Sequence, residues 1–134
     1  YYKNKFLKYI NPGFIKCVTD ENDELVAFAI TMPSFSNALK KINGKVDFFG
    51  KLRLLHAKNF NHKGSLYLIG VRPDFQNKGV IAILFNELQK FYNKFGITEV
   101  ETNPELIENT AIQQLWKNYE NNQHKNRATF TKQI

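Results

Sequence analysis

The stretch that most constrains this chain is residues 66–80, where an apolar segment passes through a short polar loop into an amphipathic one. Residues 65–72 have the composition of a β-strand, and Pro73 followed by Asp74 favours a turn directly after them. Apolar residues then recur at helical spacing over residues 79–95. The sequence therefore predicts a helix whose N-terminus lies just beyond the end of a strand.

The loop at residues 76–81 is predicted to bind an anion such as a phosphate group. The first backbone N–H groups of a helix have no partner within the helix, and the helix dipole favours negative charge at that end. Gly79 lets the backbone approach a ligand closely. Lys78 adds a positive charge, and the side chain of Gln76 adds hydrogen-bond donors.

This run resembles the signature of the GNAT superfamily of acyl-CoA-dependent N-acyltransferases. In that signature a strand ends in Val-x-Pro, and Gln/Arg-x-x-Gly-x-Gly/Ala then opens a helix. Here the strand ends in Val71-Arg72-Pro73, and residues 76–81 supply the loop. The last loop position departs from the pattern, because Ile81 stands where Gly or Ala is usual.

The resemblance implies an acetyl-CoA site built mainly from backbone groups. The strand before the loop would separate from its neighbour and pair with the pantetheine arm and the acyl carbonyl, while the loop amides would bind the pyrophosphate. The strand positions are Ile69, Gly70 and Val71 in this sequence. The loop positions are Gln76, Asn77, Lys78, Gly79, Val80 and Ile81.

A second family landmark, Asn-x-x-Ala-x-x-Leu-Tyr, falls on a helix predicted over residues 109–119. Asn109 matches the Asn that contacts the cofactor, while Ile112 replaces the Ala. Trp116 stands where the family has a Tyr that often protonates the leaving thiolate, and an indole N–H donates a hydrogen bond but is no acid at neutral pH. Tyr119, one turn further on, is the candidate acid in its place, with a core aromatic as the alternative.

No evident general base lies on the strand at residues 65–72. Glu99 and Glu101 flank Val100 on the next predicted strand and share one of its faces. Glu101 is the candidate base, acting through water, and an exposed carboxylate without a catalytic role is the alternative. The three histidines lack the spacing of metal ligands, so no metal is expected.

The order of predicted elements favours an α+β fold with a mixed sheet. It resembles the GNAT fold from that fold's second strand onward, with a helical insert between the second and third strands of this chain. We expect one domain over residues 1–134. Its predicted elements are a helix at 1–10, strands at 14–19 and 24–32, an insert at 35–63 with helices at 35–42 and 46–58, a strand at 65–72, a helix at 79–95, a strand at 97–102, a helical turn from 103, a helix at 109–119 and a strand at 126–133.

The insert is rich in basic residues. Phe48, Leu52 and Leu55 are spaced for one face of its second helix. A basic amphipathic segment of this kind can contact a membrane, a nucleic acid or a protein partner. The interpretation we favour is a helix packed on the domain with a solvated polar face. The basic residues are Lys40, Lys41, Lys45, Lys51, Arg53, Lys58 and Lys63, against the single acid Asp47.

Composition sets broader limits. No stretch approaches the roughly 18 apolar residues of a membrane span. The net charge of +7 favours anionic partners. Cys17 is the only cysteine, which precludes an internal disulfide and fits a reducing, cytoplasmic compartment. Because the chain begins with Tyr1 rather than Met, we expect it to belong to a longer polypeptide with a preceding domain.

Three functional hypotheses follow. The first is an acetyl-CoA-dependent N-acetyltransferase in which an unidentified amine attacks the thioester directly. The second is a catalytically silent module of the same fold that binds CoA or acyl-CoA, which the Trp116 substitution and the lack of a clear base favour. The third is a basic nucleic-acid-binding domain, for which no motif is present. The oligomeric state stays open.

Overall fold

The computed structural model describes residues 11–43 and 47–132, and it forms two compact units, Tyr1–Thr102 and Asn103–Ile134. The helix predicted at 1–10 lies outside the described residues. The single domain expected over residues 1–134 remains a prediction.

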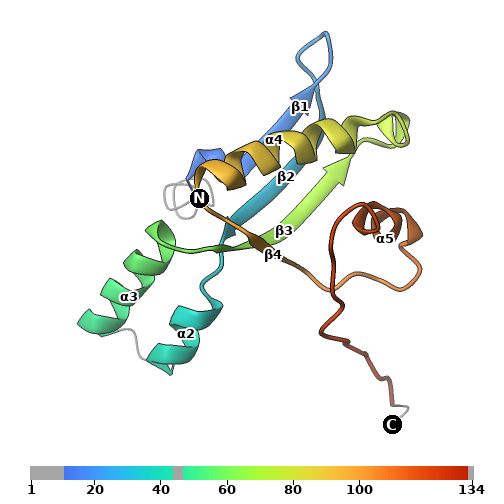
Figure 1. The fold of residues 1–134 in the computed structure, drawn as a ribbon. Coiled ribbons are helices and arrows are strands. Elements are labelled where there is room, and N and C mark those ends of the chain that lie inside the picture. The colour runs from blue at the N-terminus through green and yellow to red at the C-terminus, as the bar shows by residue number, and fades with distance from the viewer. Residues whose placement is uncertain (1–10, 44–46, 133–134) are drawn as a thin grey trace. The chain divides into compact units, whose positions relative to one another are not determined.

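The first unit is built on a four-stranded mixed sheet with the order β1-β2-β3-β4 (Figure 1). The first three strands pair antiparallel, and β3 pairs with β4 in parallel. This confirms the predicted α+β class with a mixed sheet. The strands are β1 at Ile15–Thr19, β2 at Leu25–Pro33, β3 at Lys63–Val71 and β4 at Glu99–Thr102.

The predicted hairpin between β1 and β2 is closed by an acidic side chain. The carboxylate of Asp20 accepts hydrogen bonds from the backbone N–H of Asn22 at 2.9 Å and of Glu24 at 3.0 Å. Asp23 takes a left-handed conformation, with a φ of 60°. Asp and Asn favour such turns because their short side chains can bond the local backbone.

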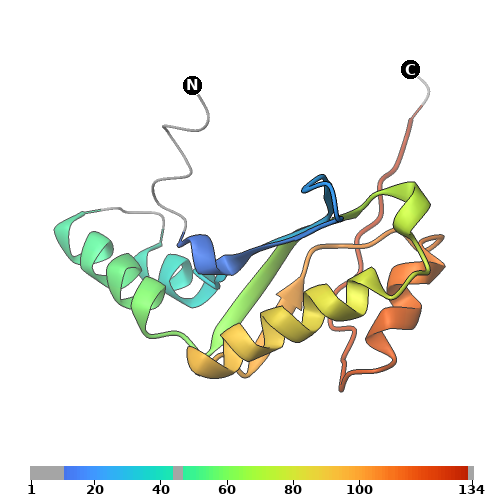
Figure 2. The same cartoon turned by 90° about the horizontal axis from the view of Figure 1, so that it is seen from above.

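The helix α4, Val80–Lys94, lies along one face of the sheet and contacts β1 and β2 (Figure 2). Leu84 and Leu88 on α4, and Ala27 and Ala29 on β2, are all at most 1% exposed. The helical periodicity of the sequence predicted this buried side correctly. The helix–sheet contact forms the main apolar core of the first unit, and it fixes the position of the helix N-terminus.

The insert forms two helices, as predicted, at the end of the sheet where β2 ends and β3 begins (Figure 1). They are α2 at Ser36–Ile42 and α3 at Phe48–Asn59. As in the favoured interpretation, α3 packs on the domain, since it contacts α2 and β2, but its predicted apolar face is not the side that packs. Phe48, Leu52 and Leu55 are 70%, 47% and 56% exposed, and the smaller residue Gly50 is buried instead.

Within residues 103–132, the described part of the second unit, the one helix is α5, Thr110–Trp116, which is shorter than the predicted 109–119. The helical turn predicted from 103 is not formed, and this irregular segment instead accepts hydrogen bonds from the amide of Gln113 and the indole of Trp116. The strand predicted over 126–133 is also wrong for its described residues, 126–132. Phe130 is 89% exposed, so this polar segment has no apolar face to bury against a sheet.

The hydroxyl of Tyr92 on α4 is shielded from solvent and has no hydrogen-bond partner within the described residues. Burial raises the pKa of this phenol, and the nearby Thr31 offsets only part of that effect. Thr31 donates its own proton to the backbone oxygen of Phe14 at 2.8 Å.

We predict that Tyr92→Phe leaves the free energy of unfolding unchanged or raises it by up to about 1 kcal/mol, because a buried hydroxyl without a partner costs stability. Thr31→Val is the matched control, and it should lower stability by about 1–3 kcal/mol because it leaves the oxygen of Phe14 without that donor. Urea unfolding of both variants tests this. A loss of more than about 1 kcal/mol in Tyr92→Phe would contradict the prediction.

Candidate functional site

The strand β3 and the edge strand β4 separate partway along β3. The parallel ladder between β3 and β4 joins Lys63 to Glu99 and ends with the pair Leu66 and Thr102. Beyond it, residues 68–71 of β3 pair with β2 only. The register with β2 shifts at the same point, because Tyr67 is an extra residue between pairs. Such a bulge bends a strand and marks where its pairing changes.

The backbone of β3 beyond the ladder alternates in direction. The N–H of Arg72 donates to the oxygen of Val26 on β2 at 2.8 Å. Because neighbouring residues of an antiparallel strand point their backbone groups to opposite sides, the N–H and C=O of Ile69 and Val71 face away from β2, and those of Gly70 face β2. Two of the three predicted strand positions therefore offer backbone groups to the open side.

Gly70 lies in a closely packed part of the sheet, where a side chain would not fit. A Cβ atom at this position would lie 2.5 Å from the ring of Phe28 on β2. Phe28 is the residue opposite Gly70 in the antiparallel ladder. The aromatic ring thus occupies the space where a side chain would stand, and sequence reasoning gave no signal for it.

The predicted anion loop contains two residues with a left-handed backbone conformation. A 3-10 turn, η3 at Pro73–Phe75, is followed by Asn77 with a φ of 62° and Gly79 with a φ of 76°. Gly79 precedes the first turn of α4 and offers no capping side chain. The N-terminus of α4 therefore has backbone donors that a bound anion can satisfy.

The surroundings of the loop are open. Gln76, Asn77 and Lys78 are exposed, and a Cβ at Gly79 would meet nothing within 4 Å. The side chain of Val80, in contrast, is 8% exposed and packs with Val26 and Ala27. Ile81 is half-buried. The loop is thus anchored by its last residues, and its polar part stays accessible to a ligand.

An arginine that sequence reasoning treated only as the middle of Val-x-Pro holds the loop in place. The guanidinium of Arg72 contacts Asp74 at 2.9 Å, Glu24 at 3.1 Å and Asp20 at 3.4 Å. It also lies over the ring of Phe75, 4.5 Å from the centroid. The hairpin turn and the loop are therefore joined through one side chain, and the only available signal was the acidic turn far away in sequence.

The contacts of Arg72 help to lower the pKa values of two neighbouring aspartates. The hydrogen bond from Arg72 holds the pKa of Asp74 below its usual 3.8. The pKa of Asp20 is also lowered, first by the backbone N–H of Glu24 and then by the nearby guanidinium. Both carboxyls therefore favour the charged, paired form at neutral pH.

The candidate base lies close to where the strands separate. Glu101 is half-buried and stands opposite Ser65, one pair before the ladder ends. Glu99, which shares its face in the sequence pattern, forms an ion pair with Lys63 at the start of the ladder. Of the two carboxylates, Glu101 is therefore the nearer to the open stretch of β3.

The remaining predicted residues gather in the second unit. Asn109 caps α5 by accepting from the N–H of Ile112 at 3.5 Å. The indole N–H of Trp116 donates to the carboxylate of Glu105 at 2.8 Å. The ring of Tyr119, which follows the end of α5, lies 6.3 Å from that of Trp116. Trp116 and Tyr119 are therefore neighbours, as predicted.

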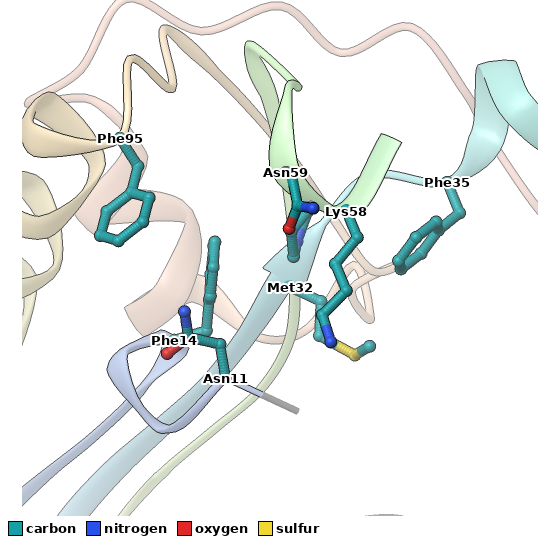
Figure 3. Close-up of a pocket in the computed structure, with 8 residues that line it drawn as sticks. Asn11, Phe14, Met32, Phe35, Lys58, Asn59 and Phe95 are labelled. Carbon is teal, nitrogen blue, oxygen red and sulfur yellow. The ribbon is translucent and has the colours of Figure 1, made fainter. Parts of the chain in front are cut away.

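A cavity of about 110 Å³ lies at the other end of the sheet from the loop. Figure 3 shows Phe14 and Phe95 on one side of it, with Met32 and Lys58 on another. Ligand pockets usually measure about 300–1,000 Å³. This cavity is too small for an acyl-CoA, so the candidate site is the open edge of β3 and the loop rather than an enclosed pocket.

Two kinds of feature are missing from the part of the chain that the structure describes. Its His, Cys, Asp and Glu side chains form no group of three that could hold a metal ion. Within residues 11–43 and 47–132, no helix has both the length and the apolar character needed to cross a membrane.

Comparison with protein families gives one match along most of the chain. A family model described as the acetyltransferase (GNAT) family matches residues 2–119. A search of curated proteins finds no match.

Several solved structures share the fold. The aminoglycoside acetyltransferase meta-AAC0020 from an uncultured soil metagenomic sample, in complex with sisomicin, is 12% identical with a TM-score of 0.53, and the match covers 90% of this chain and 64% of that one. The structure of AAC(6')-Iy with the bisubstrate analogue CoA-S-monomethyl-acetylneamine is 16% identical with a TM-score of 0.54, and the match covers 90% and 69%. The ribosomal-protein-alanine N-acetyltransferase from Brucella melitensis biovar Abortus 2308 is 14% identical with a TM-score of 0.54, and the match covers 87% and 70%. The present chain thus spans about two thirds of the length of these proteins.

The contacts of Arg72 give a testable pH dependence. Arg72→Gln should lower the melting temperature at pH 7 and speed hydrogen exchange of the N–H of Phe75. The pKa values of Asp20 and Asp74 are lowered in the folded state. Their ion pairs therefore contribute fully to folding stability above pH 3.8, and that contribution is lost as the pH falls below this value. The difference between variant and parent should therefore shrink in acid.

The matched control for this prediction is Lys90→Gln, which removes an ion pair with Glu87 on the surface of α4. It should leave the exchange of the loop unchanged. Equal exchange of the Phe75 N–H in Arg72→Gln and the parent at pH 7 would show that the arginine does not hold the loop.

Proposed function

The chain belongs to the acetyltransferase (GNAT) family, and from that premise we propose that it is an acetyl-CoA-dependent N-acetyltransferase whose amine acceptor attacks the thioester directly. The proposal specifies the acceptor only as an amine. The similar structures include aminoglycoside acetyltransferases and a ribosomal-protein-alanine N-acetyltransferase, and these three are at most 16% identical to this chain.

The observation that carries the proposal is the continuity between an open strand and a helix N-terminus. The outward backbone groups of Ile69 and Val71 lead directly to the loop of residues 76–79 and to the first turn of α4. Extended ligands pair with open strand edges through such groups, and phosphates bind at helix N-termini. An acyl-CoA carries both an amide-containing arm and a pyrophosphate, so its chemistry fits this sequence of donors and acceptors.

The residues of the loop fit the charged end of such a ligand. Open space in front of Gly79 would admit a pyrophosphate close to the backbone. The ammonium of Lys78 lies 5.1 Å from the centroid of the Phe75 ring, which keeps a positive charge beside the loop. Recognition through the backbone also explains why Ile81 can replace the usual Gly or Ala, since an N–H is retained there.

The chemistry asked of the protein is positioning and proton transfer. Acetyl-CoA, when bound, supplies the activated acetyl thioester. The acceptor nitrogen would form a bond to the acetyl carbon while the carbon–sulfur bond breaks. Glu101 would take the amine proton through water, and Tyr119 would give a proton to the departing sulfur. Holding the two reactants together would contribute much of the rate.

Trp116 would act as a positioning residue rather than an acid. Its N–H already donates to Glu105, and an indole does not release a proton at neutral pH. The same observation favours the second candidate function, a silent module that binds acyl-CoA without turnover. A cytoplasmic location accompanies either proposal, because acetyl-CoA is the expected ligand and Cys17 is the sole cysteine.

Calorimetric titration of acetyl-CoA into the chain tests the binding site. We expect binding of micromolar strength that is lost in Gly79→Glu, because a carboxylate would face the pyrophosphate. Gly96→Glu is the matched control, since Gly96 also has a positive φ, of 67° against 76° at Gly79, but follows the far end of α4. The control should bind normally. No binding by the parent chain, or equal loss in both variants, would refute the site.

Turnover with a panel of amines separates the enzyme from the silent module. If the chain is active, Tyr119→Phe and Glu101→Gln should each lower kcat by about 100-fold or more, with acetyl-CoA binding unchanged. Tyr92→Phe, which also removes a phenol hydroxyl, should not change kcat. Full activity in Tyr119→Phe would exclude Tyr119 as the acid, and tight binding without turnover of any amine would favour the silent module.

A further inference from the structure

The helix α3 turns its small side inward. Gly50 is buried, and Leu54 and Ala57 are half-buried. These residues are spaced four and three apart, so they share one side of the helix. That side meets the rest of the first unit, because α3 contacts α2 and β2. The guanidinium of Arg53 reinforces the contact by donating to the backbone oxygen of Lys41 in α2 at 3.3 Å.

The opposite side of α3 carries an exposed apolar strip, defined here as Phe48, Leu52 and Leu55. Successive residues of a helix turn by about 100°, so these three point roughly away from Gly50 and Ala57. Their exposed fractions are 70%, 47% and 56%. Phe49 and Phe60 beside the strip are 70% and 72% exposed. Single exposed apolar residues are ordinary, but several large ones clustered on one exposed helix face favour an interaction surface.

Basic residues border the strip on both sides. On the helical wheel Lys51 and Lys58 lie between the strip and the packed side, and Arg53 lies beyond the strip on the other flank. All three are exposed. The one acid of the insert, Asp47, accepts from the N–H of Gly50 at 2.7 Å as the helix cap. Within the described residues of the insert, no other carboxylate opposes the positive charge.

This arrangement fits an anionic lipid surface better than it fits a nucleic acid or a protein groove. Interfacial helices place Phe and Leu in the acyl boundary, while flanking Lys and Arg reach the headgroups. A nucleic-acid surface would gain nothing from the aliphatic centre formed by Leu52 and Leu55. The strip is the outer side of a helix, which suits a flat bilayer surface.

We propose that α3 is a membrane-docking helix that binds anionic lipid surfaces through the apolar strip and the cations beside it. Docking is peripheral, since the helix lies on the bilayer and does not cross it. The strip is at the end of the first unit where β2 ends and β3 begins, while the loop of residues 76–79 follows the opposite end of β3. The proposal is therefore independent of acetyl-CoA binding.

Flotation of the whole 134-residue chain with phosphatidylcholine vesicles, with and without phosphatidylglycerol, tests the proposal. We expect binding only to the anionic vesicles, weakened by salt. Phe48→Ser, Leu52→Ser and Leu55→Ser in one chain should lower the partition coefficient at least tenfold or so, because apolar area no longer enters the bilayer. The matched control is Leu106→Ser, Ile107→Ser and Phe130→Ser, three exposed apolar residues of the second unit, which should bind as the parent does.

A second pair of variants, which have the same net charge as each other, tests the role of the lysines beside the strip. Lys51→Glu with Lys58→Glu should weaken vesicle binding by roughly 25-fold or more, about fivefold for each lysine at the surface. Lys117→Glu with Lys132→Glu alters the net charge equally and should bind nearly as well as the parent. Circular dichroism and acetyl-CoA titration should be the same for all four variants, because none of these residues belongs to the packed core or to the loop.

Several outcomes would overturn the proposal. One is a parent chain that does not float with anionic vesicles. Another is an equal loss of vesicle binding in the strip variant and its control. Unchanged binding in the strip variant would also overturn it, because binding would then depend on overall charge and not on the strip. A parent dimer in sedimentation equilibrium that the strip variant converts to monomer would assign the strip to a second copy. Binding to an oligonucleotide but not to vesicles, lost in Lys51→Glu with Lys58→Glu, would assign it to nucleic acid.

Discussion

The constraint on which the rest of the structure depends is the early end of the parallel ladder between β3 and β4. Only the first residues of β3, up to Leu66, pair with β4. The antiparallel partner β2 keeps the following residues extended, so their outward N–H and C=O groups stand in a fixed line. A backbone held on one side and open on the other is already organised to pair with an extended ligand, which lowers the entropic cost of binding.

Charge pairing continues this fixed geometry into the loop. Arg72 follows the open strand directly, and its three carboxylate partners come from the hairpin turn and from the loop itself. Each exposed ion pair alone contributes little, but one guanidinium shared among several partners limits the positions that the loop can take. The packing of α4 against β2 then sets where the helix N-terminus lies. Strand edge, loop and helix terminus thus form one connected surface.

The insert could be predicted from the sequence only in part. Its helices were predictable because their periodicity is local, but the side of α3 that packs was predicted wrongly. A small residue such as Gly50 allows the helix to approach its neighbours closely, whereas Phe48 and Leu52 would hold it away. Apolar spacing indicates that a face has a partner, yet it does not say whether the partner belongs to the same chain. The strand predicted over 126–133 failed for a related reason, since a strand needs a neighbour to pair with.

The sequence by itself determined the hairpin and the helix α4, because turn chemistry and helical periodicity act over a few residues. The spelling of residues 71–81 also predicted the candidate site. Only the tertiary structure decided that Ile69 and Val71 direct their backbone groups to the open side, since strand register sets that alternation. It also decided that Phe28 covers Gly70 and that Arg72 reaches Asp20 and Glu24. These contacts join residues about 40 or more positions apart in the chain, and such pairings leave no local trace in the sequence.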